Sequence, residues 1–353
     1  MSDLSAFDFD LPEDNIALRP IEPQDAARLL VVHADGRLID AHVRDLPDFL
    51  DAGDIMVFND TRVIPAALKA VRAARDELGR DVPVDINLVE RLTDRAWLAL
   101  ARPGKRLRVG DVLSISENLS AQITDKCDDG EIALQFSQSG EALDAAIDAY
   151  GAMPLPPYIA RRRQADAHDR ETYQTSFAGN EAGSVAAPTA GLHFTPRLLS
   201  DLDAAGIARA FVRLHVGLGT FAPLKDAQIE SGTLHKEWRH ISPDVAARLN
   251  EVRDTGHRCI AVGTTALRTL ESCAEEDTGR LQAATGPTDI FIQPGYRFRA
   301  TDALVTNFHL PRSSLFMLVC ALMGTDVMQN AYAHAITRAY RFYSYGDACL
   351  LLP

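Results

Sequence analysis

The sequence contains few cysteines, and they lie far apart. The five are Cys127, Cys259, Cys273, Cys320 and Cys349, and no two of them form a C-x-x-C pair. Disulfide frameworks and zinc sites need paired or closely spaced cysteines. The odd, scattered set is therefore typical of reduced, buried thiols in a cytoplasmic protein.

A long apolar run is also absent. The longest stretch, roughly Leu315 to Met323, is shorter than the ~20 residues that a membrane-spanning helix needs. The N-terminal segment MSDLSAFDFDLPED is acidic and lacks the basic start and apolar core of a signal peptide. These absences predict a cytoplasmic protein with no membrane association.

Positive charge is in deficit. The formal net charge is −13, which predicts solubility and long-range repulsion of polyanions, and taken alone it argues against a nucleic-acid partner. Basic residues nevertheless cluster in ARPGKRLRVG (residues 101–110) and at Arg161–Arg163. Such clusters are also typical of a solvated surface, so composition leaves the partner open.

Several catalytic motifs are missing. Neither G-x-G-x-x-G nor G-x-x-x-x-G-K-[S/T] occurs, which argues against dinucleotide and P-loop nucleotide binding. The absence of G-x-S-x-G argues against a serine hydrolase. No H-E-x-x-H pair occurs, and His193, His215, His235 and His309 lie on separate segments, so no metal site is predicted.

The length of 353 residues suits two domains, or one large domain that carries an insertion. From about Ala66 to Tyr150, short apolar–polar alternations such as Val82–Leu88 are separated by glycine-containing turns. Several short strands at close spacing predict a small β-barrel, whose closure removes exposed strand edges.

Outside this segment, strands alternate with helices. Ile55–Phe58 is an uninterrupted apolar run, typical of a strand covered on both faces. From about Ser184 onward, helices begin after the capping residues Thr195 and Ser242 and at the Gly263-Thr264-Thr265 turn. The alternation predicts a largely parallel sheet. The predicted fold is α/β: a large mixed α/β domain (residues 1–65 and 151–353) with an inserted small β-barrel domain (residues 66–150).

The segment Ala186–Phe221 packs a strand, a loop, a helix, a second strand and a second loop into 36 residues. His193 lies in the first loop and His215 just before the second. Ligands of open α/β folds bind where loops leave the carboxyl ends of strands. Arg213 and His215 alternate onto one face of the second strand, which favours a ligand site there. The alternative is a surface ion pair beside a structural histidine.

Three further strands end in polar residues: Asn59–Arg62, Gly263–Thr265 and Thr306–His309. The Gly263–Thr265 turn opens a helix, whose free N–H groups and dipole favour a carboxylate or phosphate. Arg268 and Glu271 fall on one flank of this helix, where the alternative is a surface ion pair. Four polar strand ends in one domain predict a shared active-site rim.

Eight sequence blocks occur in order: FNDTRVIPA (58–66), MPLPPYI (153–159), AAPTAGLHFT (186–195), LHVGLGTF (214–221), VGTTALRTLES (262–272), TDIFIQPGYRF (288–298), TNFHLPRSSLFMLV (306–319) and YRFYSYGDA (340–348). Together they closely resemble the S-adenosylmethionine:tRNA ribosyltransferase-isomerases of queuosine biosynthesis, from about Asn15 to the C-terminus. The sequence departs from the family pattern at Lys236, where serine is expected, and at Pro287, where tryptophan is expected. Lys236 bears on the contacts of His235 and Glu237.

The resemblance implies an enzyme that uses S-adenosylmethionine as a ribosyl donor. The acceptor would be 7-aminomethyl-7-deazaguanine at the wobble position of a tRNA, and the products epoxyqueuosine-tRNA, adenine and methionine. S-Adenosylmethionine would be a co-substrate, with no permanently bound cofactor. The alternatives are an S-adenosylmethionine-dependent tRNA methyltransferase and a non-catalytic tRNA-binding protein.

This chemistry requires acid–base groups and positioning, and no metal, because the sulfonium already activates the neighbouring carbon. We predict a general base at His193 or His215, with His309 and Glu271 as further candidates. Arg268 and the Gly263–Thr265 amides are expected to hold the methionine carboxylate. The predicted substrate-binding residues are Asp60, Arg62, Thr189, Arg213, Gly217, Gly219, Thr220, Gly263, Thr264, Thr265, Arg268, Asp289 and Asn307.

An acidic tRNA enzyme must concentrate its basic residues, because phosphate contacts dominate affinity for RNA. The predicted tRNA-binding residues are Arg102, Lys105, Arg106, Arg161, Arg162 and Arg163. The target base must leave its stack, and Phe194 and Tyr343 are candidates to receive it, with core packing as the alternative. We expect the protein to be a monomer.

Overall fold

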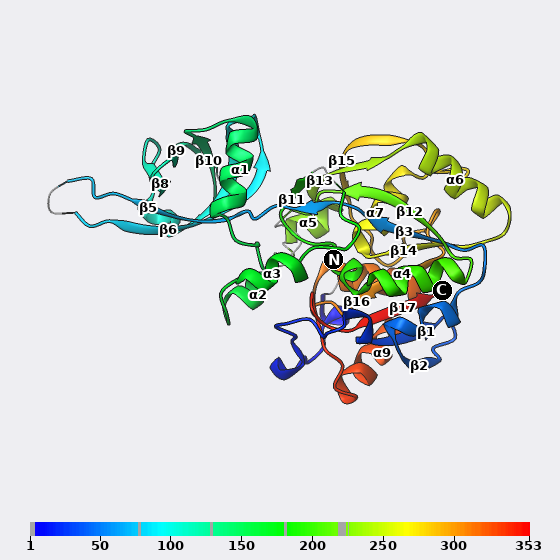
Figure 1. The fold of residues 1–353 in the computed structure, drawn as a ribbon. Helices are drawn as coiled ribbons and strands as arrows, with labels where there is room; N and C mark the ends of the chain where they lie inside the picture. Colours follow the sequence, from blue (N-terminus) through cyan, green and yellow to red (C-terminus); the bar gives the residue numbers. More distant parts are fainter. Residues whose placement is uncertain (1–3, 77–78, 128–129, 180–181, 218–223, 225) are drawn as a thin grey trace. The chain divides into compact units, whose positions relative to one another are not determined.

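A large mixed sheet and a closed barrel make up the fold (Figure 1). This computed structural model describes residues 4–76, 79–127, 130–179, 182–217, 224 and 226–353. Contacts divide the chain into an α/β unit (Met1–Thr61, Thr175–Gly179 and Pro188–Pro353) and a barrel unit (Arg62–Gln174 and Asn180–Ala187). The predicted fold class is confirmed. That residues 66–150 form a domain by themselves stays a prediction.

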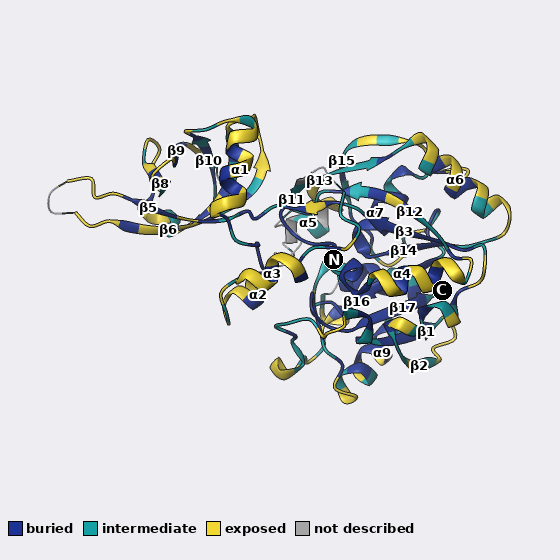
Figure 2. Cartoon of the chain, in the orientation of Figure 1, coloured by how far each residue is buried: buried dark blue, intermediate teal, exposed yellow. Residues whose placement is uncertain are grey.

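The described part of the α/β unit contains a nine-stranded sheet in the order β15-β13-β12-β3-β14-β16-β17-β1-β2. Its strands are β1 (Arg28–His33), β2 (Leu38–His42), β3 (Ile55–Asn59), β12 (Ala208–Leu214), β13 (Thr233–Ile241), β14 (Cys259–Val262), β15 (Ala284–Ile290), β16 (Ala303–Asn307) and β17 (Ala348–Leu352). All residues of β3, β14 and β16 are buried, as their apolar runs predict (Figure 2).

The four central strands β12, β3, β14 and β16 pair in parallel. On one side, β13 runs antiparallel to β12 and β15. On the other side, β17 runs antiparallel to β16 but parallel to β1, and β2 is antiparallel to β1. The expectation of a largely parallel sheet is therefore wrong outside the central strands, because strand direction depends on long-range pairing that apolar periodicity does not encode.

The first strand of the chain, β1, and the C-terminal strand, β17, lie side by side in this sheet, which no local pattern in the sequence predicts. The C-terminal strand β17 inserts between β16 and β1, and residues Ala348–Leu351 are fully buried there. The N-terminal strand β1 pairs with β17 over residues Leu29–His33. Placing these two apolar strands inside the sheet removes their side chains from water, which stabilises the fold.

Helices cover the sheet of the α/β unit. They are α4 (Pro196–Ala204), α5 (Asp226–Ser231), α6 (Pro243–Asp254), α7 (Thr264–Cys273), α8 (Ser314–Met323) and α9 (Thr325–Thr337), with short 3-10 segments at η1 (Leu4–Phe7), η2 (Glu13–Asn15), η3 (Gln24–Ala26), η4 (Val43–Phe49) and η6 (Thr189–His193). The predicted N-caps are confirmed: Thr195 accepts from the Leu198 N–H at 3.2 Å and Ser242 from the Val245 N–H at 3.3 Å.

Helix α7 is buried along almost its whole length, from Thr264 to Glu271. It contacts β12, β13, β14 and β15. The alternative interpretation of Arg268 and Glu271 as a surface ion pair is therefore wrong, because both side chains are inside the protein and each has other partners.

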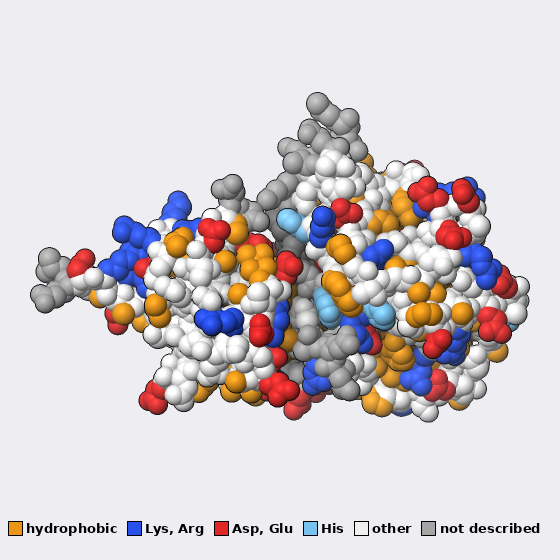
Figure 3. All heavy atoms as spheres, turned by 90° about the horizontal axis from the view of Figure 1, so that it is seen from above, with side chains coloured by type: hydrophobic (Ala, Val, Ile, Leu, Met, Phe, Trp, Pro, Cys, Tyr) orange, Lys and Arg blue, Asp and Glu red, His pale blue; other side chains and the backbone are white. Residues whose placement is uncertain are grey.

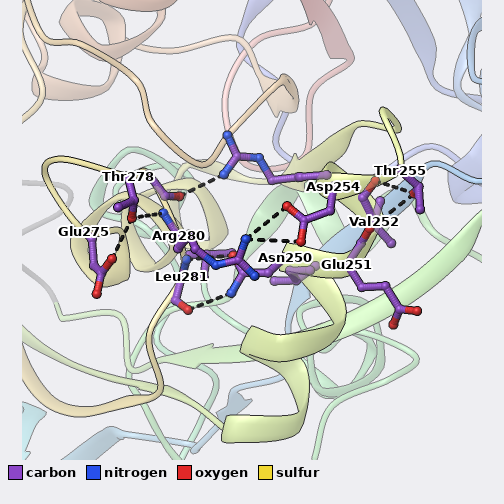
Figure 4. Close-up of polar contacts among 12 residues, drawn as sticks. Asn250, Glu251, Val252, Asp254, Thr255, Glu275, Thr278, Arg280 and Leu281 are labelled. Atoms are coloured by element: carbon purple, nitrogen blue, oxygen red, sulfur yellow. Dashed lines mark hydrogen bonds and ion pairs between the residues drawn. The ribbon is translucent and has the colours of Figure 1, made fainter.

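The segment after α7 is fastened to helix α6 (Figure 4). The Asn250 side chain donates to the Leu281 carbonyl and accepts from the Leu281 N–H, both at 2.9 Å. Arg280 pairs with Asp254 at 3.0 Å. This attachment fixes the path of the chain from α7 into β15.

Among the described residues, no single helix has the length and apolar content to cross a membrane. Only α8 and α9 taken together have that length and apolar content, and the angle between their axes is 115°. Most residues of α8 are buried, so its apolar composition fits a core helix.

The barrel unit contains the closed barrel β10-β7-β6-β5-β8-β9. Its strands are β5 (Ala67–Arg72), β6 (Val82–Arg91), β7 (Ala96–Arg102), β8 (Val112–Ser116), β9 (Leu119–Lys126) and β10 (Glu131–Phe136), and the unit adds β4 (Arg62–Val63), η5 (Gly104–Arg106), α1 (Gly140–Tyr150), α2 (Pro157–Ala160), α3 (Ala167–Thr172) and β11 (Ala182–Ser184). Along β6 the apolar side chains are buried and the polar ones alternate outward, as predicted.

Helix α1 leaves the barrel through Gly151, where the chain passes close to its own beginning. A Cβ atom at Gly151 would lie 1.9 Å from the Pro65 carbonyl oxygen, whereas a Cβ at Gly104 meets nothing within 4 Å. We expect Gly151→Ala to lower the free energy of unfolding by about 1–3 kcal/mol through overpacking. Gly104→Ala is the matched control, and urea unfolding measures both. Equal stabilities of the two variants would contradict this packing.

Candidate functional site

Four polar strand ends lie at one edge of the sheet. Strands β12, β3, β14 and β16 are neighbours in that order and run in the same direction. Their carboxyl ends therefore meet, and the segments that follow them, residues 59–61, 215–217, 263–265 and 306–309, share this edge. The strand order therefore brings these segments to one edge of the sheet, and that this edge is an active-site rim stays a prediction.

At the ends of β3 and β12, the side chains of Asn59 and Asp60 tie the two strands together. Asn59 Oδ1 accepts from the Leu214 N–H at 3.1 Å, and Asn59 Nδ2 donates to the Leu214 carbonyl at 2.9 Å. Asp60 accepts from Arg213 Nε and Nη2, both at 2.8 Å. Asp60 and Arg213, predicted separately, thus form one bidentate ion pair.

His215 lies next to this ion pair. Its Nδ1 is 2.9 Å from the hydroxyl oxygen of Thr61, which is fully buried. Its ring stacks on Trp238, with centroids 5.0 Å apart and planes 18° apart, and Trp238 in turn stacks on His240. The ring is therefore held on one edge by a hydroxyl group and on one face by an indole.

His193 is engaged differently. Its Nε2 lies 2.9 Å from the Gly346 carbonyl and its Nδ1 3.2 Å from the Ala190 carbonyl. Burial lowers the pKa of His193, despite the two carbonyls and Asp347, which favour the charged ring. Both nitrogens thus face backbone oxygens, and the ring joins η6 to the turn before β17.

His309 contacts a neighbouring side chain, and Glu271 binds backbone groups. His309 Nε2 lies 3.0 Å from the Thr306 hydroxyl, and burial lowers the pKa of His309 to about 3, so the ring is neutral. Glu271 accepts from the N–H groups of Arg299 and Ala300 and from the Tyr296 hydroxyl, at 2.9–3.2 Å. Both carboxylate oxygens of Glu271 are therefore used inside the protein.

Arg268 is buried, with 4% of its side chain exposed, and it forms an ion pair with buried Glu237 through Nη1. Its Nε and Nη2 atoms have no hydrogen-bond partner among the described residues. The Nε and Nη2 atoms of an arginine can donate to the two oxygens of one carboxylate, as Arg213 does to Asp60. Arg268 can therefore bind one further carboxylate.

Two more buried polar atoms on the rim segments and α7 have no partner in the described part of the chain: Thr265 Oγ1 and Asn307 Nδ2. Thr265 precedes Arg268 by three residues on α7, so both lie on one side of that helix. Asn307 ends the neighbouring strand β16 and accepts from the Thr189 hydroxyl at 2.8 Å. An unpaired buried polar group costs about 1–3 kcal/mol, so these groups suit a polar ligand.

The turn before α7 is shaped by Gly263, which has φ of 89°. Its N–H donates to the Val305 carbonyl at 2.7 Å, and a Cβ added there would lie 3.6 Å from the Ala190 side chain. Segment η6 thus packs against this turn. Thr189, Gly263, Thr264, Thr265 and Asn307 are therefore brought together by three neighbouring segments.

The other predicted substrate-binding residues are dispersed. Arg62 is exposed on β4 of the barrel unit, and Asp289 is half-buried on β15. Gly217 donates its N–H to Glu237 Oε1 at 3.0 Å. Gly219 and Thr220 lie outside the described residues.

The predicted tRNA-binding residues belong to the barrel unit. Arg102, Lys105, Arg106, Arg161 and Arg162 are exposed. Arg163 is held by Asp169, which accepts from both of its Nη atoms at 2.6 and 2.7 Å. Because Asp169 is fully buried, Arg163 has a structural role that the sequence did not indicate.

Phe194 and Tyr343, the two candidates to receive a nucleobase, are both buried inside the protein. Phe194 is 1% exposed and packs edge-on against Phe58, with centroids 4.9 Å apart, so it belongs to the core. Tyr343 is buried in a left-handed conformation (φ 74°), and its N–H donates to the Phe308 carbonyl at 3.1 Å. Backbone strain of this kind is often found at functional sites.

The sequence did not assign roles to Thr61, which stands in the block FNDTRVIPA, or to Glu237 and Trp238, which directly follow Lys236. Alternation along β13 separates Glu237, which faces α7 and Arg268, from Trp238, which faces His215. The sequence shows this alternation along β13, but it does not show that Arg268 and His215 are the partners of Glu237 and Trp238. Across the described residues, no group of three or more His, Cys, Asp or Glu side chains is arranged to hold a metal ion.

Comparison with known proteins places these observations in a family. A family model described as queuosine biosynthesis protein matches residues 4–351. The S-adenosylmethionine:tRNA ribosyltransferase-isomerase of Hyphomonas neptunium is 69% identical over 351 residues, covering 99% of this chain and 100% of that protein. The protein of the same name from Maricaulis maris is 56% identical, covering 99% and 98%.

A solved structure agrees with this placement. The S-adenosylmethionine tRNA ribosyltransferase of Thermotoga maritima is 36% identical, with a TM-score of 0.56, and the match covers 98% of this chain and 100% of that one. Sequence and structure are therefore similar over their whole lengths. The chain belongs to the queuosine biosynthesis protein family.

Proposed function

We propose that this protein is an S-adenosylmethionine:tRNA ribosyltransferase-isomerase. It transfers and isomerises the ribosyl group of S-adenosylmethionine onto 7-aminomethyl-7-deazaguanine at the tRNA wobble position, and releases adenine and methionine. The similarity to proteins of this name over almost the entire chain supports the proposal. The observation that carries it is the buried Arg268, whose Nε–Nη2 edge has no partner in the described chain and lies beside Thr265.

In this proposal Arg268 binds the methionine carboxylate. A carboxylate on the Nε–Nη2 edge makes two charge-assisted hydrogen bonds, and the Glu237 contact fixes the plane of the guanidinium. The first amides of α7 and the Thr265 hydroxyl supply further donors at a helix N-terminus, where the dipole favours negative charge. Asn307 Nδ2 and Thr189 suit the ribose hydroxyls or the purine.

Among the candidate acid–base groups, His215 is half-buried, whereas His193, His309 and Glu271 are buried. His193, His309 and Glu271 use their polar atoms to hold backbone or neighbouring side chains. His215 is half-buried at the end of β12, next to the Asp60–Arg213 pair. We therefore assign His215 to the reaction and the other three to the support of the rim.

A basic surface on the barrel unit suits the tRNA backbone. Arg102, Lys105, Arg106 and Arg108 are exposed, and no described carboxylate lies within ion-pair distance of them. By contrast, neighbouring Arg75 pairs with Asp111 at 2.6 Å. In Figure 3, Lys and Arg side chains gather on the part of the barrel unit where Figure 1 places β5 and β6. We call these four residues the η5 cluster.

Charge is divided unevenly along the chain. Residues 62–174 carry 16 Lys and Arg against 18 Asp and Glu, whereas the remainder carries 20 against 31. The excess of acid thus lies mainly outside the barrel unit. A local basic surface can bind phosphates even when the net charge is negative, because screening limits repulsion to ~10 Å at moderate salt.

The reaction is tested by its products. Incubation with S-adenosylmethionine and tRNA carrying the deazaguanine precursor should yield adenine, methionine and an epoxyqueuosine nucleoside, identified by mass spectrometry. S-Adenosylhomocysteine with a methylated tRNA would show a methyltransferase and overturn the proposal. Binding of tRNA without any small-molecule product would show a non-catalytic binding protein.

Replacing the bidentate edge tests the carboxylate site. Arg268→Lys keeps a positive charge beside Glu237 but removes the Nε–Nη2 edge. We expect kcat/KM for S-adenosylmethionine at saturating tRNA to fall about 10- to 150-fold, which corresponds to the loss of ~1.5–3 kcal/mol of charged hydrogen bonding. Arg280→Lys, at the exposed pair with Asp254, is the matched control. An unchanged kcat/KM in the Arg268 variant would refute this assignment.

Removing the unpaired basic charges tests the RNA surface. The variant R102Q/K105Q/R106Q/R108Q should bind tRNA more weakly, and the slope of log K against log salt should fall by up to ~0.9 for each phosphate that the protein no longer neutralises. The control R91Q/R170Q/R209Q/R280Q removes the same charge from residues that pair with carboxylates. If both variants lose affinity equally, the η5 cluster is not a specific RNA surface.

A further inference from the structure

An arginine lies on the inward face of the barrel. Along β5, apolar Leu68 and Ala70 are buried, and so is Arg72 at the end of the strand. Lys69 and Val71, which alternate with them, are exposed. Arg72 therefore shares the inward face of β5 with apolar residues, and it is 7% exposed. Arginine is almost never this buried unless it is paired, so its partners indicate its role.

The described residues do little to compensate the charge of Arg72. Its Nη1 donates to the Ala73 carbonyl at 2.9 Å, and its Nε is fully buried without a hydrogen-bond partner. No described carboxylate lies within ion-pair distance of it. The residues opposite it, Val82 on β6 and Leu113 on β8, are apolar and buried. A buried charge without a paired anion lowers the stability of a protein, because nothing replaces its hydration.

Asp111 lies near Arg72 but is bound to other groups. Its carboxylate accepts from Arg75 Nε at 3.0 Å and Nη2 at 2.6 Å, and from the Arg108 N–H at 2.8 Å. The hydrogen bonds from Arg75 lower the pKa of Asp111 most, and the charge of Arg72 contributes to the same shift. Arg72 is thus close enough to interact with Asp111, but Arg75 already neutralises that carboxylate.

Further cations belong to the same end of the barrel. Arg75 Nη2 donates to the Arg106 carbonyl at 3.0 Å, which fixes η5 beside the Arg75–Asp111 pair. The cations brought together in this way are Arg72, Arg75, Arg106 and Arg108. Asp111 pairs with Arg75, and the other three have no ion pair among the described residues. Such a group of unpaired cations favours the binding of an anion.

We propose that Arg72 is the fixed cation of a phosphate-binding site at this end of the barrel, where it holds one backbone phosphate of the tRNA together with Arg106 and Arg108. This inference rests on the proposed function, because it names a contact of the tRNA substrate. The phosphate approaches the Nη end of the guanidinium, since Nε is enclosed. The Arg72 side chain is already ordered inside the barrel, so binding costs it less conformational entropy than it costs an exposed arginine.

Unfolding separates this binding role from a structural one. Arg72→Met removes the charge and keeps an unbranched apolar stem between Val82 and Leu113. Because the buried charge has no paired carboxylate, we expect the urea midpoint of this variant to equal or exceed that of the native protein. A lower midpoint would assign Arg72 to the stability of the barrel in place of the binding site.

Binding of tRNA tests the site itself. We expect Arg72→Met to raise the Kd for precursor tRNA about 10-fold, as for the loss of one charged hydrogen bond, and to lower the slope of log K against log salt by ~0.7–0.9, the value for one phosphate. Arg72→Lys keeps the charge and should retain most of the slope. Lys69→Met, on the exposed face of the same strand, is the matched control. Equal losses in the two Met variants would refute the site.

A free phosphate ion has the same chemistry as the RNA backbone, and inorganic phosphate is the probe that tells them apart. We expect millimolar phosphate to compete weakly with tRNA for the native protein and not at all for Arg72→Met. If phosphate raises the thermal unfolding temperature of the native protein but not of Arg72→Met, while both bind tRNA equally, the site belongs to a free anion and the RNA contact is overturned.

The two proposals can fail separately. If tRNA binding depends on Arg72 but no adenine is released from S-adenosylmethionine, the proposed function fails and the phosphate site stands. If adenine and epoxyqueuosine-tRNA are formed but Arg72→Met binds tRNA as tightly as the native protein does, only the phosphate site fails.

Discussion

The parallel pairing of β12, β3, β14 and β16 is the constraint on which the candidate site depends. Because these strands run in one direction, the residues that follow each of them reach the same edge of the sheet. Strands β3, β14 and β16 are buried along their whole length, and their polar residues stand at or beyond the carboxyl end, at Asn59, Thr306 and Asn307. The same alignment that forms the core therefore collects the polar side chains.

Those polar side chains divide into two groups by their hydrogen bonding. Asn59, Glu271 and His193 use their polar atoms on backbone groups, and they fix the loops of the rim. Arg268 and Asn307 are equally buried but keep donors without partners among the described residues. Since unpaired buried donors are costly, the second group marks where a polar ligand fits. Burial alone would not separate the two groups.

Substrate chemistry and RNA binding place opposite demands on charge. Two cations at the rim of the α/β unit are held in ion pairs, Arg213 with Asp60 and Arg268 with Glu237, which fixes their geometry. The η5 cluster on the barrel unit is exposed, and its charges are free of described carboxylates. Exposed, unpaired cations favour phosphate contacts, whereas buried, paired ones favour directed hydrogen bonds. An acidic chain can serve both purposes because the charges lie on different units.

The sequence by itself determined the helix starts at Thr195 and Ser242, the apolar central strands, the barrel alternation and the family. These signals act over a few residues, or are carried by the sequence blocks themselves. Only the tertiary structure decided that β17 lies between β16 and β1, and that His193 is engaged by Gly346, 153 residues away. It likewise decided that Glu237 is the partner of Arg268. Such pairings depend on which distant segments pack together, and a pattern of neighbouring side chains in the sequence does not predict this packing.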